Sequence, residues 1–483
     1  MNTIQRIAKN TGVIIAGDIV NKAISLAVGI FLARYLGAGG YGKLAFVSAY
    51  LAFFIIVTDL GINTILVREI SRDKSLALKY TGNAAAIKLI LSILAIASAA
   101  IIIILMPYPA DTKVYIYIMS LTLFFNSFSG LYSTIFQVNL KMNYNVIANL
   151  IGRILSAGLI FWIIFSEGTL LQIIVVLSFS SFVVMLINYF YLRKFVKPKF
   201  EFDFSVWKFF IKESWPLALT ISFIMIYTRI GQIILSWMKG DVALGYYVAP
   251  VRLIEALGII PAAFMISIFP ILSEYYNTSP VSYKRTYQIS FKYILMLIIP
   301  IAVGATLLAK SIIHLFFRAQ FSQSIPVLQI LIWSEIFVFF GIINQQILIS
   351  ANKQIFDLVF TSIAAIINII LNFIFIPRIG IVGAAIATVI SYSIGSGAVP
   401  GLFLLATREY NLSGWQHMIK PVIASSIMGI YVYYMKFNLP LAIIGGVIIF
   451  FLVMFLIRGI NIQDIKLIKA IYIQRKEDIV TKK

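Results

Sequence analysis

Five basic side chains lie inside long apolar stretches of the chain, where a charge needs a physical reason. They are Lys22, Lys88, Arg153, Arg229 and Arg252. A cation at the centre of a membrane-spanning helix costs about 2.5–3.5 kcal/mol on insertion scales, and such residues often mark the path of a substrate or ion. We therefore treat the five as candidate substrate-binding residues.

Local pairing is the alternative explanation for these cations. Asp18 precedes Lys22 by four residues. Glu255 follows Arg252 by three. Either spacing brings the two charges to one helix face. A long basic side chain can also extend its charged end to the membrane surface. Neither explanation suits Arg153 and Arg229, because they have no acid three or four residues away and lie near the middle of their apolar stretches.

The acids inside apolar stretches are the second set of candidates. They are Asp18, Asp59, Glu255 and Glu335. A carboxylate within a membrane can exchange protons or hold Na⁺. Asp18 and Glu255 are the candidates for ion coupling because each lies beside a cation, although the same position also suits a purely structural partner.

The composition places these residues in an integral membrane protein. The 483 residues are 61% hydrophobic and 12% charged, with a mean hydropathy of +0.97, whereas globular domains have about 45–50% apolar and about 25% charged residues. This balance excludes a disordered chain, a soluble enzyme and a nucleic-acid-binding domain. The absence of cysteine excludes disulfides, iron–sulfur clusters and thiolate zinc sites.

A transmembrane helix needs about 20 mostly apolar residues. The apolar runs predict an all-α protein with about fourteen transmembrane helices. The predicted spans are 12–35, 41–67, 81–106, 112–138, 143–165, 170–192, 212–237, 242–275, 291–310, 325–350, 354–376, 381–406, 417–435 and 439–457.

The lysines and arginines set the orientation, because basic loops stay in the cytoplasm. Placing both termini in the cytoplasm puts most of the 39 basic residues there. The net charge of +21 is then a topology signal. We expect a multi-pass protein of the cytoplasmic (inner) membrane, with membrane lipids and no nucleic acid among its partners.

The chain also looks duplicated. Gly37 and Gly42 follow the first span, and Gly240 and Gly245 follow the seventh, at an offset of 203 residues. Parallel repeats of this kind build many transporters. We expect a six-helix lobe at 1–197, a second at 198–410, and two further helices with a basic tail at 411–483.

Two soluble-enzyme motifs match at the first glycine turn. Residues 37–42 fit G-x-G-x-x-G, and 37–43 fit the start of a phosphate loop. Both are rejected, because a transmembrane helix precedes the turn and Leu44 stands where the phosphate loop needs Ser or Thr. The two histidines have no metal-ligand spacing. We expect no cofactor and no metal.

Three stretches, at 31–70, 227–270 and 376–388, carry a resemblance to a known family. They contain Phe-Leu-Ala-Arg-Tyr-Leu-Gly, Tyr-Thr-Arg-Ile and Ile-Pro-Arg-Ile-Gly-Ile-Val-Gly-Ala-Ala. The chain resembles bacterial and archaeal polysaccharide flippases of the multidrug, oligosaccharidyl-lipid and polysaccharide exporter superfamily. One departure is Gly231, where many members carry Asp, and another is Pro250, which replaces a small residue. A role of that Asp in coupling is therefore in doubt here.

The resemblance implies a transporter that flips a lipid-linked oligosaccharide, carried on an isoprenoid pyrophosphate or phosphate, for cell-surface polysaccharide or glycan biosynthesis. A pyrophosphate head needs cations, preferably arginine. Arg153 of the first lobe with Arg229 and Arg252 of the second are suited to hold it. H⁺ or Na⁺ is the expected coupling ion, and no covalent step is required, so we do not expect an enzyme.

Two alternatives stay open at this point. A drug or organic-cation antiporter of the same superfamily would need a cavity dominated by carboxylates, whereas five internal cations face four deep acids here. A membrane glycosyl polymerase would need a long outer loop with catalytic acids, whereas the expected outer loops are short.

Overall fold

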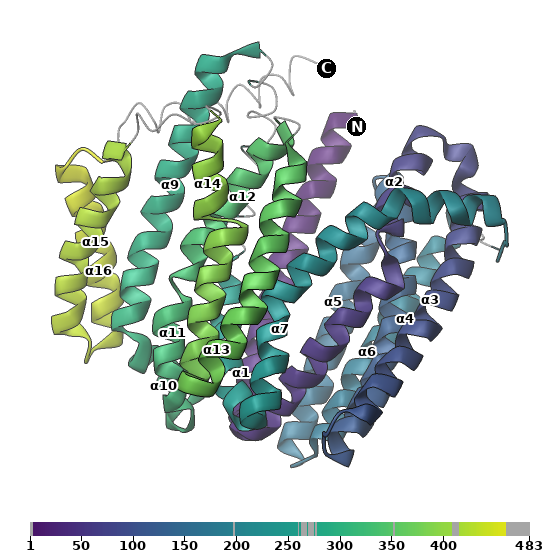
Figure 1. Ribbon diagram of the computed structural model, residues 1–483, viewed down its shortest axis with the longest axis horizontal. Helices are drawn as coiled ribbons and strands as arrows, with labels where there is room; N and C mark the ends of the chain where they lie inside the picture. The colour runs from purple at the N-terminus through teal and green to yellow at the C-terminus, as the bar shows by residue number, and fades with distance from the viewer. Residues whose placement is uncertain are drawn as a thin grey trace. The chain divides into compact units, whose positions relative to one another are not determined.

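Every regular element in the described part of the chain is helical (Figure 1). The computed structural model describes residues 3–196, 199–258, 260–261, 268, 275, 278–350, 353–407 and 415–459. The chain divides into two compact units, residues 1–245 and 246–483. The predicted all-α class is confirmed.

Unit 1 holds six helices, a 3-10 turn and most of a seventh helix. They are α1 (Thr3–Asp59), α2 (Ile62–Arg72), η1 (Lys74–Leu76), α3 (Ala77–Leu105), α4 (Ala110–Val138), α5 (Asn143–Phe165), α6 (Leu170–Leu192) and α7 (Phe204–Leu257). Unit 2 takes the end of α7 and the remaining elements. These are α9 (Pro280–Leu307), α10 (Ala309–Phe317), η2 (Ala319–Ser324), α11 (Ile325–Leu331), α12 (Ser334–Ser350), α13 (Gln354–Gly395), α14 (Ala398–Ala406), α15 (Trp415–Met435) and α16 (Leu439–Leu456).

Three of the longest helices break at a glycine. Gly37 divides α1, Gly240 divides α7 and Gly380 divides α13, with φ of 63°, 81° and 59°. Glycine takes this left-handed backbone without the steric cost that a Cβ would bring. Each break falls between two predicted spans, so the expected glycine turns after the first and seventh spans are confirmed.

The helix bounds test the predicted spans individually. The predicted spans 143–165 and 170–192 coincide with α5 and α6. Within the described residues, nine helices are long and apolar enough to cross a membrane, or ten if one bent pair counts as a single span. Three of the nine include a glycine break. The protein is thus a multi-pass membrane protein, and the number fourteen stays a prediction.

Some predicted spans are wrong in their continuity. The predicted span 41–67 ends at Asp59, because Leu60 and Gly61 adopt φ of 46° and 83° and the chain restarts as α2. The predicted span 325–350 bends by 42° between α11 and α12. The predicted span 381–406 is interrupted between α13 and α14. A few polar or glycine residues stand at each break, but the apolar residues on both sides merge into one predicted span. Most of 259–277, and the basic tail from residue 460, lie outside the described residues.

The start of α7 belongs to the core of unit 1. Val206 and Phe210 are buried with Ile65 and Leu66 of α2 and Phe136 of α4. The proposed six-helix lobes would meet at residue 197, whereas the compact units meet at 245. The boundaries of the six-helix lobes therefore stay a prediction. The first part of α7 packs in the core of unit 1, although its sequence falls in the second predicted lobe.

Large apolar side chains also cover the outside of the helices. Leu105 is 79% exposed and Phe165 is 84% exposed. Such surfaces are unfavourable in water and suit a lipid environment.

In unit 2, α15 and α16 pack on each other and α15 packs on α9 (Figure 1). This helix pair corresponds to the two helices expected after the second lobe.

Candidate functional site

The two glycine turns of unit 1 touch each other through their backbones. A Cβ placed on Gly42 would lie 1.8 Å from the carbonyl oxygen of Asp241. One placed on Gly245 would lie 1.9 Å from the carbonyl oxygen of Ala38. Gly245 is the counterpart of Gly42 at the 203-residue offset, and Ala38 is the counterpart of Asp241. The second contact is therefore the first with the two turns exchanged. Only glycine permits this reciprocal approach, so the sequence spacing reflects a real meeting of the two turns.

Polar side chains surround this contact. Lys43 forms an ion pair with Asp111. The Ser236 hydroxyl donates to Asp241 Oδ1 at 3.0 Å, and Tyr108 donates to Ser236 at 3.3 Å. Burial raises the pKa of Tyr108 to about 12. Tyr108 therefore stays protonated at neutral pH and acts as a hydrogen-bond donor beside the turns.

Lys88 lies in a closed ion pair. Its side chain is fully buried, and Nζ donates to Asp59 Oδ1 at 2.5 Å and to the Thr58 carbonyl at 3.5 Å. The backbone N–H of Asn63 also donates to Asp59, at 3.4 Å. Asp59 thus balances the charge of Lys88 within the protein. No local spacing in the sequence links this pair, because its members are 29 residues apart on different helices.

Lys22 and Arg153 lie at one level on two parallel helices. A Cβ on Gly17 would meet Val146 Cγ1 at 2.3 Å, and the rings of Phe31 and Phe161 lie 5.0 Å apart. These two contacts show that α1 and α5 run in the same direction. Lys22 is five residues beyond the first contact and Arg153 is seven beyond it, which places them about 3 Å apart in height.

The side chains at this level are accessible. Lys22 and Arg153 are both exposed, as is Asp18. Arg229 is half-buried on α7, eleven residues before the break at Gly240. Lys22 stands fifteen residues before the break at Gly37. Measured along the helices from these breaks, the two positions are about 16 and about 22 Å deep. Unit 1 therefore carries three of the predicted cations at similar depths.

Arg252 and Glu255 form the local pair expected from their spacing. Arg252 Nη1 lies 3.7 Å from Glu255 Oε2, and the side chains are 45% and 39% exposed. An exposed pair of this length is worth at most about 1 kcal/mol. Arg252 therefore keeps part of its surface for other contacts.

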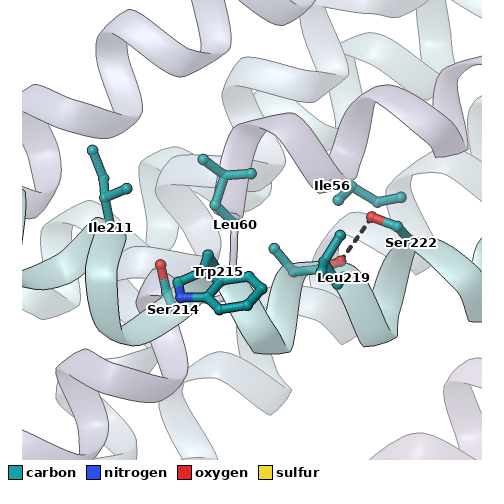
Figure 2. Close-up of a pocket in the computed structure, with 8 residues that line it drawn as sticks. Ile56, Leu60, Ile211, Ser214, Trp215, Leu219 and Ser222 are labelled. Carbon is teal, nitrogen blue, oxygen red and sulfur yellow. Dashed lines mark hydrogen bonds between the residues drawn. The ribbon is translucent and has the colours of Figure 1, made fainter. Parts of the chain in front are cut away.

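A cavity of about 250 Å³ lies in unit 1 where the end of α1 meets α7 (Figure 2). Ile56, Leu60, Trp215 and Leu219 line it with apolar surface, and the Ser222 hydroxyl in its wall donates to the Ala218 carbonyl at 2.7 Å. No lining residue is charged. The cavity suits a hydrocarbon group rather than an anion. The described residues contain no group of three or more acids and histidines placed to hold a metal ion.

The sequence of residues 7–276 matches a family described as polysaccharide biosynthesis protein. The chain belongs to this family. Residues 216–374 also match the family named MatE. These matches confirm the predicted resemblance to flippases of the wider superfamily.

Three curated relatives are similar in sequence. A putative O-antigen transporter of Shigella flexneri is 23% identical over 74% of this chain and 88% of its own length. A probable low-salt glycan biosynthesis flippase, Agl15 of Haloferax volcanii, is 24% identical over 83% of this chain and 84% of its own. An uncharacterized membrane protein of Methanocaldococcus jannaschii is 31% identical, over only 26% of this chain and 25% of that protein.

The fold is also that of a solved transporter structure. The lipid II flippase MurJ in an inward closed conformation superposes with a TM-score of 0.76, covering 92% of this chain and 98% of that one at 17% identity. At this identity the likeness concerns the fold.

Proposed function

We propose that the protein flips a lipid-linked oligosaccharide, carried on an isoprenoid pyrophosphate or phosphate, from the cytoplasmic to the outer leaflet of the cytoplasmic membrane by alternating access. Its membership of the polysaccharide biosynthesis protein family supports this proposal. So do the names of its two long relatives, an O-antigen transporter and a glycan biosynthesis flippase. Transport of this kind makes and breaks no covalent bond, so the protein is not proposed to be an enzyme.

The observation that carries the site is the common level of Lys22 and Arg153. Both cations are exposed and lie at one height on α1 and α5, so this level of the unit carries two positive charges. A pyrophosphate offers several oxygens and binds best to more than one cation, including the planar fork of an arginine. Arg229 at similar depth on α7 is the third proposed contact.

The other predicted cations receive lesser roles in this proposal. Lys88 is proposed to stabilise the fold through its ion pair with Asp59 and not to contact the substrate. Arg252 is proposed as a secondary contact that keeps its pairing with Glu255.

Charge and shape can be separated by substitution at the proposed site. Replacing Lys22 and Arg153 together by Gln removes both charges, while Arg153→Lys keeps the charge and loses the fork. We expect the double variant to reach the membrane normally and to fail to restore surface polysaccharide in a flippase-deficient strain, with Arg153→Lys intermediate. Lys208→Gln removes an exposed cation at the start of α7 and serves as the matched control. Full restoration by a well-expressed double variant would refute the site assignment.

The orientation is proposed with both termini in the cytoplasm. It rests on the distribution of basic residues. A reporter that is active only inside the cell should give signal when fused after Lys483 and none when inserted at Thr112. The reverse pattern would invert every assignment of sides.

A further inference from the structure

Glu335 is a buried acid that the site described above does not use. Its side chain is 6% exposed, and its Oε2 atom is buried without a hydrogen-bond partner among the described residues. Leaving an ionised carboxylate buried and unpaired costs several kcal/mol in general. A group in this position is therefore expected to carry a proton or to be neutralised by a cation when the substrate pathway is at rest.

Two helix irregularities occur at the level of Glu335. The acid lies in the first turn of α12, immediately after the 42° bend that separates α11 from α12. Trp333 Nε1 donates to Thr306 at 3.2 Å, and the rings of Phe340 and Phe291 lie 4.6 Å apart, so α12 and α9 run antiparallel.

Interpolation between those two contacts places Glu335 opposite Ala302 of α9, two residues from Pro300, which lies inside that helix. Proline removes one backbone N–H from a helix and so leaves one carbonyl without its usual donor. Ion sites in secondary transporters commonly form at such interrupted helices near the middle of the membrane. The position of Glu335 therefore favours an ion-binding role over a packing role.

The charged neighbours of Glu335 can be named for each packed element. The carboxylate of Glu255, on α7, acts electrostatically on Glu335. The packed helix α9 contributes Lys292, whose ammonium lies 5.7 Å from the Tyr293 ring. The packed helix α13 carries Asp357 and Arg378, and Asp357 accepts a hydrogen bond from Gln345 at 3.1 Å, ten residues beyond Glu335 along α12. The packed helices α11 and α14 contain no charged residue.

We propose that Glu335 binds and releases a proton during transport. The proposed ligand is a proton, which a single buried carboxyl group can carry without further ligands. The coupling of proton exchange to transport rests on the proposed flippase function. The binding of a proton by Glu335 does not depend on that function.

The test uses the full-length protein in liposomes and has two readouts. Infrared spectroscopy follows the carbonyl band of a protonated carboxylic acid as the pH is changed, and a second assay follows transfer of lipid-linked oligosaccharide under an imposed pH gradient. We expect the wild type to show a titrating band that is absent in Glu335→Gln and retained in Glu335→Asp. Glu167→Gln removes an exposed carboxylate in the loop after α5, serves as the control, and should leave the band unchanged.

Each outcome decides one of the two proposals. Loss of the pH-gradient stimulation in Glu335→Gln, with retention in Glu335→Asp and Glu167→Gln, supports proton coupling. A band that survives in Glu335→Gln, or wild-type transfer that responds to a Na⁺ gradient and not to pH, would overturn the inference. If the wild type moves no lipid-linked oligosaccharide yet loses its band only in Glu335→Gln, the flippase proposal fails while the proton site stands.

Discussion

The Lys88–Asp59 pair gives the sharpest stability prediction, because its two ends differ in burial. The Lys88 side chain is 0% exposed, whereas Asp59 is 29% exposed. Removing Asp59 leaves an ammonium ion with no access to water. Removing Lys88 leaves a carboxylate that reaches the surface and still accepts the N–H of Asn63. The two single substitutions should therefore have unequal costs.

The size of the difference follows from general values. Removing one partner of a buried ion pair costs about 3–5 kcal/mol when the remaining charge stays buried. We expect this cost for Asp59→Ala. Lys88→Met keeps most of the volume and loses hydrogen bonds, at about 1–2 kcal/mol. Asp59→Asn, which keeps an acceptor, should fall between them. The double variant should resemble Lys88→Met, because no orphaned ammonium remains.

Heat denaturation of the purified protein in detergent tests this order. The measurement is the temperature at which half of the sample leaves the monodisperse peak in size-exclusion chromatography. Asp59→Ala should show the lowest midpoint, and adding Lys88→Met to it should raise the midpoint. If Lys88→Met alone is as damaging as Asp59→Ala, or if the two losses simply add, the asymmetric burial argument is wrong.

Two further predictions concern the turns and the start of α7. Gly42→Ala and Gly245→Ala should each lower the yield of folded protein in the same chromatography assay, because the added Cβ would overlap a carbonyl oxygen. Gly39→Ala is the control and should be tolerated, because its Cβ would meet only an ordinary contact at 3.5 Å. The ion pair and hydrogen bond with Lys79 lower the pKa of Asp203, so the stabilising interaction is fully present at neutral pH and is lost as the pH falls below the ordinary carboxyl range. The protection of amide hydrogens at the start of α7, measured relative to their intrinsic exchange rate at each pH, should fall in that acid range for the wild type and stay constant there for Asp203→Asn. Identical profiles would contradict the assignment.

Helix ends that lie beside polar loop residues were predicted well from the sequence. The ends of α5 and α6 coincide with the predicted spans because loop residues such as Lys141, Glu167 and Arg193 interrupt the hydropathy there. The breaks at Gly37 and Gly240 were also predictable, since glycine pairs recur at one offset. The break at Leu60 was not predicted, although Thr58, Asp59 and Gly61 stand there, because one charged residue does not by itself end a predicted span.

The candidate site was predictable in its residue types and not in its geometry. The cost of placing charges in apolar stretches identified all five cations from sequence. Their partners depend on how separate helices pack, which no local spacing encodes. For this reason Lys88 could not be assigned to Asp59 in advance, and the common level of Lys22 and Arg153 became visible only through the contacts between α1 and α5.

The reciprocal contact between the two glycine turns has a consequence for sequence drift. The carbonyl oxygens of Ala38 and Asp241 make the contact, and the side chains of these residues take no part in it. One position is apolar and the other acidic, yet both offer the same oxygen to a glycine. The side chains at these two positions are therefore free to diverge, and Asp241 has acquired a separate bond to Ser236. A library that randomises residue 38 should retain many functional members, while the same library at Gly42 should retain almost none.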